Sequence, residues 1–127
     1  MKYIAKGMGV SQGKARGRVK VIRNFDDHVR FNKGDILVTH LTDPTMVKVM
    51  NMAGGIVCNI GGLTSHPSIV SREMGTPCIV SAKCVETGKN VTEVLKDGQL
   101  VEICGETGDI HLVDDEPEKK EGWKLKW

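Results

Sequence analysis

The sequence predicts a single α/β domain in which a central sheet carries short helices after its strands and ends in a hairpin. Three observations support this fold class. The chain has 127 residues, enough for one hydrophobic core and too few for two. A helical pattern lies between apolar runs at 36–38 and 56–60, which predicts a β-α-β unit with parallel strands. Near the end, runs at 100–103 and 110–113 flank a glycine-bounded turn, as in a β-hairpin.

Upstream of the β-α-β unit, the sequence predicts one strand and a surface excursion. Apolar and basic residues alternate over 18–22, with Val19 and Val21 on the same side, as in a half-buried strand. Residues 24–33 are mostly polar and lead to a turn at Gly34. We therefore expect this excursion to lie on the surface.

The helix of the β-α-β unit has a clear start. Asp43 can accept hydrogen bonds from the free amides, and Pro44 suits the first helical position. Met46, Met50 and Ala53 then recur at helical spacing, so we expect one face of this helix to be buried.

A second strand, loop and helix follow directly. After the strand at 56–60, a short helix is expected to begin near His66 and to stop at Gly75, because glycine commonly ends helices. A strand is expected at 78–80, and residues 82–96 should contain a loop and a short helix.

Composition excludes several classes of protein. The net charge is +2, with 18 basic and 16 acidic residues mixed along the chain, so no basic stripe is available for a nucleic-acid backbone. No signal segment and no membrane-spanning stretch are present, which predicts a soluble, cytoplasmic protein. We expect residues 1–113 to form the domain and 114–127 to be a charged, mobile tail or linker. The alternative for the tail is a docking segment anchored by Trp123 and Trp127.

The four cysteines are expected to be reduced and to bind no metal. No two of them have the C-x-x-C spacing of a zinc or redox motif, and most lie in apolar surroundings, where a thiol behaves as a small hydrophobe. They are Cys58, Cys78, Cys84 and Cys104.

The most informative stretch surrounds His66. No Asp, Glu, Lys or Arg occurs over the 23 residues 49–71, although 27% of the chain is charged. The histidine follows a glycine pair, Gly61 and Gly62, and a hydroxyl pair, Thr64 and Ser65. If Ser65 caps the helix, the amides of this loop and of the first helical turn surround the imidazole, and such a place favours an anion, above all phosphate.

This arrangement suits a histidine that becomes phosphorylated. The reaction requires a free ring nitrogen, donors for the phosphoryl oxygens and little negative charge nearby. The downstream sequence agrees, because its nearest carboxylate, Glu73, lies almost two helical turns away. The alternative is a core histidine whose nitrogens are both bonded to the backbone.

The stretch G-G-L-T-S-H-P-S-I-V-S-R-E-M-G-T-P-C-I-V, residues 61–80, resembles the phosphohistidine signature of phosphoenolpyruvate-utilising enzymes. The family includes phosphoenolpyruvate synthase, pyruvate phosphate dikinase and enzyme I of the sugar phosphotransferase system. The resemblance covers residues 8–113 and implies a swivelling β/β/α domain. It also implies that His66 carries the phosphoryl group, and that Thr64, Ser65 and Arg72 are its flanking signature positions.

The chain departs from the family pattern in places. Ser68 and Ser71 stand where the family mostly has alanine, and Cys78 and Ser81-Ala82 replace its usual small residue and glycine.

Other polar residues have simpler interpretations. Arg72 lies about 240° round the helix from His66, which favours an ion pair or a surface cation over phosphate contact. His40 is interpreted as a loop histidine, although the end of its strand could bring it to the same rim. We expect no chemical role for His28 or His111.

The resemblance predicts a phosphoryl carrier that acts through His66 and is not catalytically complete alone. Its expected partners are nucleotide-binding and phosphoenolpyruvate- or pyruvate-binding phosphotransferase domains on other chains, and Mg²⁺ is expected on the partner domain rather than here. The alternative is a non-catalytic interaction module of the same fold. A serine hydrolase is disfavoured because Ser65 and His66 are sequence neighbours, which places them poorly as a nucleophile and its base.

Overall fold

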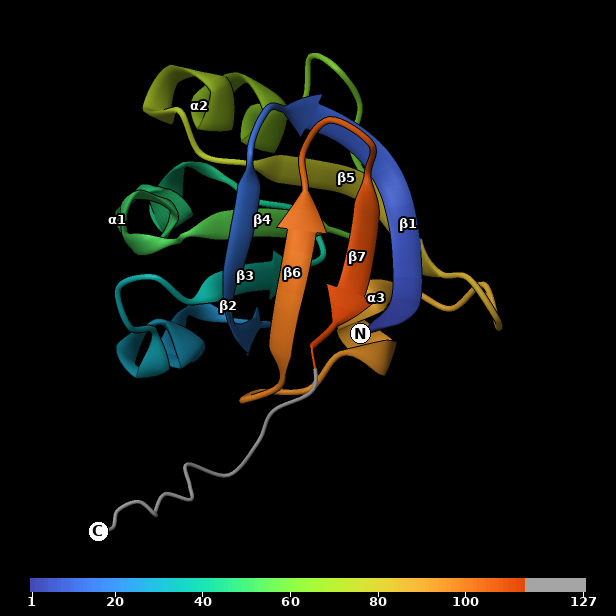
Figure 1. Cartoon of the computed structure of the whole chain (residues 1–127). Helices are drawn as coiled ribbons and strands as arrows, with labels where there is room; N and C mark the ends of the chain where they lie inside the picture. The colour runs from blue at the N-terminus through green and yellow to red at the C-terminus, as the bar shows by residue number, and fades with distance from the viewer. Residues whose placement is uncertain (114–127) are drawn as a thin grey trace, which may run out of the picture.

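The computed structural model describes residues 1–113, so the expected tail at 114–127 lies outside the described residues. Seven strands form one mixed sheet that closes into a barrel in the order β1-β5-β4-β3-β2-β6-β7 (Figure 1). The predicted α/β class, with a central sheet and short helices after its strands, is therefore wrong. The elements are β1 (Lys2–Ser11), β2 (Lys14–Ile22), η1 (Phe25–Arg30), β3 (Ile36–Thr39), η2 (Pro44–Met46), α1 (Val47–Met52), β4 (Gly55–Cys58), α2 (His66–Met74), β5 (Cys78–Cys84), α3 (Val91–Val94), β6 (Leu100–Cys104) and β7 (Asp109–Leu112).

The barrel closes through β1, a strand that the sequence analysis did not predict. This strand pairs antiparallel with both β5 and β7, and its register shifts within each pairing. Glycines permit the close approach: a Cβ on Gly7 would lie 2.5 Å from the Val80 carbonyl oxygen. Gly7 and Gly9 also interrupt the alternation of apolar and polar residues by which a strand is recognised in a sequence.

The predicted parallel strands are confirmed. β3 lies between β2 and β4 and is parallel to both, and β4 is parallel to β5. All four residues of β3 and all four of β4 are buried. Strands covered on both faces are expected to be apolar throughout, which explains why both could be recognised in the sequence.

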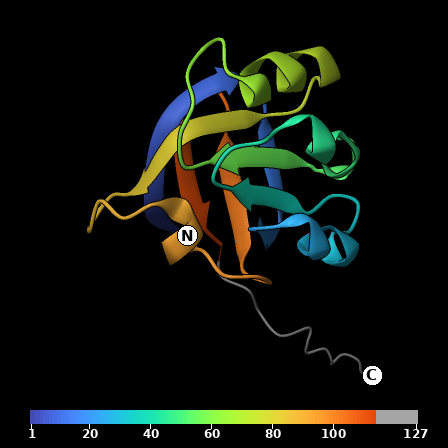
Figure 2. The same cartoon turned by 180° about the vertical axis from the view of Figure 1, so that it is seen from behind.

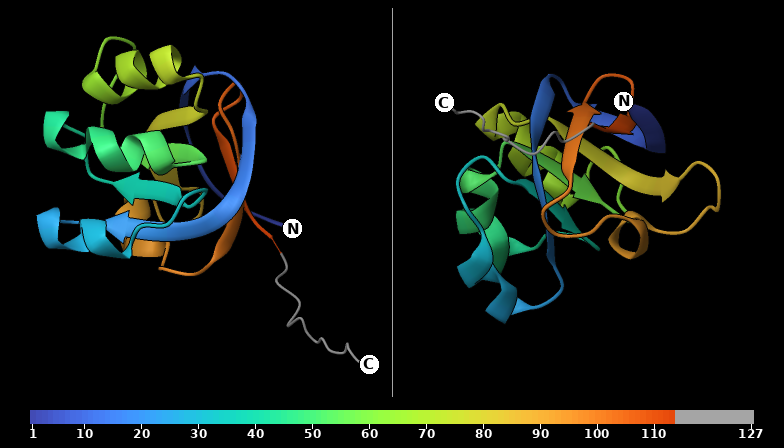
Figure 3. Two further views of the ribbon diagram at one scale, coloured as in Figure 1. Left: turned by 90° about the vertical axis from the view of Figure 1, so that its left-hand side faces the viewer. Right: turned by 60° about the horizontal axis from the view of Figure 1, so that its bottom comes forward.

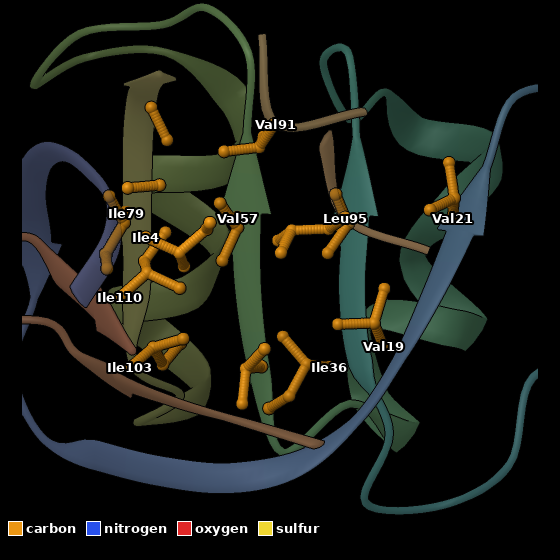
Figure 4. Packing of buried hydrophobic residues seen from close by; sticks show 14 residues of the cluster. Ile4, Val19, Val21, Ile36, Val57, Ile79, Val91, Leu95, Ile103 and Ile110 are labelled. Carbon is orange, nitrogen blue, oxygen red and sulfur yellow. The ribbon is translucent and has the colours of Figure 1, made fainter. Parts of the chain in front are cut away.

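One face of each parallel strand points into the barrel. Apolar side chains from all seven strands fill the interior, together with Val91 of α3 and Leu95 (Figure 4). Val19 and Val21 belong to this interior, as the alternation predicted. Val91 and Leu95 close one end of it.

The other face of the parallel strands packs against the helices. A second apolar cluster joins Leu37 and Ile56 of the sheet to Met46, Val49 and Met50 around α1. The helical segments η1, α1 and α2 lie on one side of the barrel, opposite the antiparallel strands β6 and β7 (Figures 2 and 3). Helices do therefore cover strands here, but only on the outside of a closed sheet.

Several local predictions are confirmed. The Asp43 carboxylate accepts a hydrogen bond from the Thr45 amide at 2.8 Å and so caps the helical segment that begins at Pro44. The second helix ends at Gly75, whose φ of 71° is left-handed. β6 and β7 form the expected antiparallel hairpin. Among residues 1–113, no helix has the length and hydropathy that crossing a bilayer requires.

Candidate functional site

His66 is the first residue of α2 and follows β4 through the loop at 59–65. Ser65 occupies the N-cap position with an extended backbone (φ −72°, ψ 162°). Pro67 takes the second helical position, where the lack of an N–H costs no intrahelical hydrogen bond. The histidine is half-buried. The structure thus places it on the first turn of the helix.

Thr42 holds one nitrogen of this imidazole. Its hydroxyl oxygen lies 2.8 Å from Nδ1 of His66. Thr42 is only 2% exposed and follows β3, which is the parallel neighbour of β4, so the loops after the two strands meet at one edge. Within residues 1–113, Nε2 of His66 has no hydrogen-bond partner, so this nitrogen is available to a reactant.

Thr42 was not predicted to be a site residue. In this loop the sequence indicated Asp43 as the helix cap and His40 as a loop histidine. The available signal was a hydroxyl residue at the carboxyl end of a strand parallel to the one that leads to His66. The parallel pairing itself was predicted, so this signal could have been used.

The side chain of Ser65 does not cap the helix, which corrects the expected role. Its hydroxyl donates to the Gly62 carbonyl oxygen at 2.8 Å and accepts from the Gly62 amide at 3.2 Å. The Ser68 hydroxyl donates to the same carbonyl oxygen. Ser65 therefore stabilises the loop, and the amides that it was expected to cap stay free for another acceptor.

Arg72 also binds the loop. Its Nε donates to the Val10 carbonyl oxygen at 2.8 Å, and one terminal nitrogen donates to the Leu63 carbonyl oxygen at 2.7 Å. Of the two alternatives expected for Arg72, an ion pair or a surface cation, no ion pair is found within residues 1–113, and the residue is exposed. Arg72 thus ties the loop before His66 to β1.

Thr64 is exposed, and its hydroxyl has no hydrogen-bond partner in the described part of the chain. The amide groups of Leu63, Thr64 and His66 likewise donate to no backbone or side-chain acceptor there. The amide of Gly62 is bonded to Ser65, and Gly61 lies against β5, with its carbonyl oxygen bonded to Ser81. Of the glycine pair expected to bind phosphate, only the Gly61 amide donates to no acceptor among residues 1–113.

A polar cavity of about 370 Å³ lies at the same edge of the sheet. Its wall includes the residues that directly follow three parallel strands: Arg23 after β2, His40 after β3 and Asn59 after β4. The buried Asn59 amide bonds Nδ1 of His40 at 3.2 Å and the Thr92 hydroxyl at 2.9 Å. His40 therefore lies at the rim that was considered for it. His28 lines the same cavity, and its ring packs at a tilt against that of Phe25.

A carboxylate lies closer to His66 than the sequence analysis expected. The pKa of Asp43 is held below its usual value, first by the hydroxyl and amide of Thr45 and further by the imidazoles of His66 and His28. Asp43 is close to His66 because it directly follows Thr42. The expectation of little negative charge near the histidine is therefore only partly met.

Two cysteines lie close to this site, because the Cys58 thiol hydrogen-bonds with the Thr42 backbone and the Cys78 thiol with the Ser71 side chain. All four are free thiols. Burial raises the pKa of Cys58, and burial raises that of Cys78 to about 11, so both behave as core residues. Among residues 1–113, no group of three or more His, Cys, Asp or Glu side chains could hold a metal ion.

Replacing His66 with alanine should change the free energy of unfolding by about 1 kcal/mol or less. The side chain is half-buried and makes one hydrogen bond, and water can take its place beside Thr42. The measurement is urea denaturation. The control is Ile79→Ala inside the barrel, where the loss should be about 2–5 kcal/mol. A comparable loss at both positions would mean that His66 is a core histidine.

A family model described as "PEP-utilising enzyme, mobile domain" matches residues 31–108, which include Thr42, the loop at 59–65 and α2. The chain belongs to this family. The mobile domain is 48% identical over 108 residues to a probable phosphoenolpyruvate synthase from Methanothermobacter thermautotrophicus, and these cover 85% of the chain. The match takes up 15% of that relative's length, so most of the related enzyme has no counterpart in this chain.

Solved structures support the fold of the mobile domain. The Enzyme I solution structure matches with a TM-score of 0.52 and 26% identity, covering 72% of this chain and 38% of that one. Aconitase X from Thermococcus kodakaraensis matches with a TM-score of 0.62, covering 87% and 98%. At 17% identity, the second likeness concerns the fold alone.

Proposed function

We propose that this mobile domain carries a phosphoryl group on Nε2 of His66 and moves it between a donor site and an acceptor site on other domains. The observation that carries the proposal is the contact between Nδ1 and the Thr42 hydroxyl. It leaves Nε2 as the nitrogen without a partner in residues 1–113. A neutral imidazole nitrogen with a free lone pair is a nucleophile.

In the proposed step, the Nε2 lone pair attacks phosphorus while the bond to the leaving group breaks and its electrons depart with that group. Nδ1 keeps its proton and donates a hydrogen bond to the Thr42 hydroxyl oxygen. The free amides of Leu63 and Thr64 are proposed as loop donors for the phosphoryl oxygens. The reverse step, with an acceptor in place of the leaving group, returns His66 to its starting form.

The donor and acceptor sites are proposed to lie on nucleotide-binding and phosphoenolpyruvate- or pyruvate-binding domains of other chains. The relative named above is a probable phosphoenolpyruvate synthase, and 85% of its length lies outside the match. Mg²⁺ is proposed to act on the partner domain, where it would neutralise the charge of the transferring phosphoryl group. The free thiols of the chain suit a cytoplasmic location.

The test uses phosphoramidate, a small P–N donor that can phosphorylate histidine without a partner and releases ammonia. We expect the protein to gain one phosphoryl group that is lost in acid and kept in base, as an N–P bond requires. Peptide mapping should place it between Lys48 and Arg72, on His66. With ATP or phosphoenolpyruvate instead, labelling should require a partner domain.

The control is the His66→Ala protein, which should take up no acid-labile label. An acid-stable label on Thr64 or Ser65 would contradict the histidine mechanism. If neither phosphoramidate nor a partner with ATP or phosphoenolpyruvate labels the parent protein, the domain is instead a non-catalytic interaction module.

A further inference from the structure

Ser81 has a backbone conformation that is unusual for its residue type. It is the only non-glycine residue within 1–113 with a positive φ, at 54°. It lies where β1 and β5 change register: Met8 pairs with Val80 and Lys6 with Lys83, so Gly7 alone faces Ser81 and Ala82. Such a bulge usually has glycine in the left-handed position, because a side chain there is strained.

The Ser81 side chain connects this bulge to the loop before His66. Its hydroxyl donates to the Gly61 carbonyl oxygen at 2.8 Å, across 20 positions of sequence. The loop is packed tightly at this point: a Cβ on Gly61 would lie 3.1 Å from the Val80 side chain and 3.0 Å from the Ser65 hydroxyl. A glycine at position 81 would relieve the strain but would lose this bond.

The next two carbonyl oxygens of the loop are held in the same way. That of Gly62 accepts from Ser65 and Ser68, and that of Leu63 accepts from Arg72. Side chains of β5 and α2 thus hold three consecutive carbonyl groups, with Ser81 holding the first.

These bonds also fix the direction of the loop amides. Every described peptide bond is trans, so each carbonyl points opposite to the amide of the next residue. Holding the Gly62 and Leu63 carbonyls therefore orients the free amides of Leu63 and Thr64, which the proposed mechanism uses. Holding the Gly61 carbonyl orients the Gly62 amide toward Ser65, which in turn holds the Gly62 carbonyl.

We propose that Ser81 is a positioning residue for the phosphoryl-accepting loop, and that its strained backbone is retained because its hydroxyl fixes the first of these carbonyls. Only the expected effect of Ser81 on phosphoryl transfer to His66 rests on the proposed function. The order of the loop can be measured without any phosphoryl donor. The residue touches neither the imidazole nor, in the proposed mechanism, the phosphoryl group.

The test compares Ser81→Gly with the parent protein. Because the strain is relieved, Ser81→Gly should be at least as resistant to urea as the parent. Hydrogen exchange at the two bonded loop amides, those of Gly62 and Ser65, should nevertheless become about tenfold faster, while exchange in β4 stays unchanged. Phosphorylation of His66 by phosphoramidate should slow on the order of tenfold. A residue that only stabilised the fold would not produce faster loop exchange in a protein of undiminished stability.

Gly88→Ser provides the matched control. It places a serine at another left-handed position, with φ of 74° and no atom within 4 Å of the added Cβ. This change should lower stability without altering exchange at 61–65 or the rate of phosphorylation. Parent-like loop exchange and rate in Ser81→Gly would overturn the proposal. If the parent itself takes up no phosphoryl group, the proposed function fails, and the exchange result alone decides whether Ser81 orders the loop.

Discussion

Replacing Gly108 with alanine is expected to destabilise the barrel by about 3 kcal/mol or more. Its φ of 83° is left-handed, and a Cβ there would lie 2.0 Å from the Gly7 carbonyl oxygen. The Gly7 amide also donates to the Gly108 carbonyl oxygen at 2.9 Å. The clash would therefore separate β1 from the turn between β6 and β7, where the barrel closes. Urea denaturation measures the loss.

The chain contains its own control for this prediction. The segments C-V-E-T-G and C-G-E-T-G, which end at Gly88 and Gly108, form the same turn, with the glycine amide bonded to the cysteine carbonyl at 2.9 Å in both. Gly88 is also left-handed but has open space around it. Gly88→Ala should therefore cost only about 1–2 kcal/mol. Equal losses at the two glycines would show that the contact with Gly7 does not hold the barrel closed.

The parallel strands could be predicted because local sequence reflects their burial. β3 and β4 are covered on both faces, so each is a short, continuous apolar run. The helix between them could also be placed, because Asp43 and Pro44 mark its start with residues that act on their immediate neighbours. Strands and helix starts that are determined by residues close in sequence could therefore be predicted.

Closure of the sheet could not be predicted, because its cause is not local. The residues that pair with β1 lie 67 or more positions away along the chain, and the pairs Ala5↔Cys84 and Ala5↔Ile110 give one residue two partners. Gly7 and Gly9 permit these contacts through the absence of a side chain, which carries no periodic signal. Local pattern alone therefore supported only a central sheet with short helices after its strands, without its closure.

The same distinction applies to the site. His66, its loop and its helix form one continuous segment, so their arrangement was predicted from local signals. Thr42 and Ser81 reach the segment from 24 and 20 positions away, and neither is distinguished by its own neighbours. Ser65 shows the limit of a local rule, because its hydroxyl oxygen was expected to accept from the helix amides and accepts from the Gly62 amide instead.

Replacing Thr42 with valine is expected to slow phosphorylation of His66 by phosphoramidate about 10- to 100-fold. Valine has nearly the shape of threonine but no hydroxyl, so Nδ1 loses the partner that fixes the ring and its proton. The ring can then turn, and its proton can occupy Nε2, where no lone pair is left to attack phosphorus. The rate and the ¹⁵N shifts of the His66 ring, which report the position of the proton, are the two measurements.

Thr42→Ser is the matched variant, since it keeps the hydroxyl and should keep a rate near that of the parent. Thr42 is buried, so the stability of both variants must be measured. In the valine protein, water beside the half-buried His66 can hydrogen-bond with Nδ1, which limits the loss of rate. A folded Thr42→Val protein with the parent's rate and ring shifts would mean that Thr42 does not set the reactive nitrogen. If Thr42→Val is slow and has altered ring shifts, and Thr42→Ser has the parent's rate and shifts, then the Thr42 hydroxyl determines that Nε2 reacts rather than Nδ1.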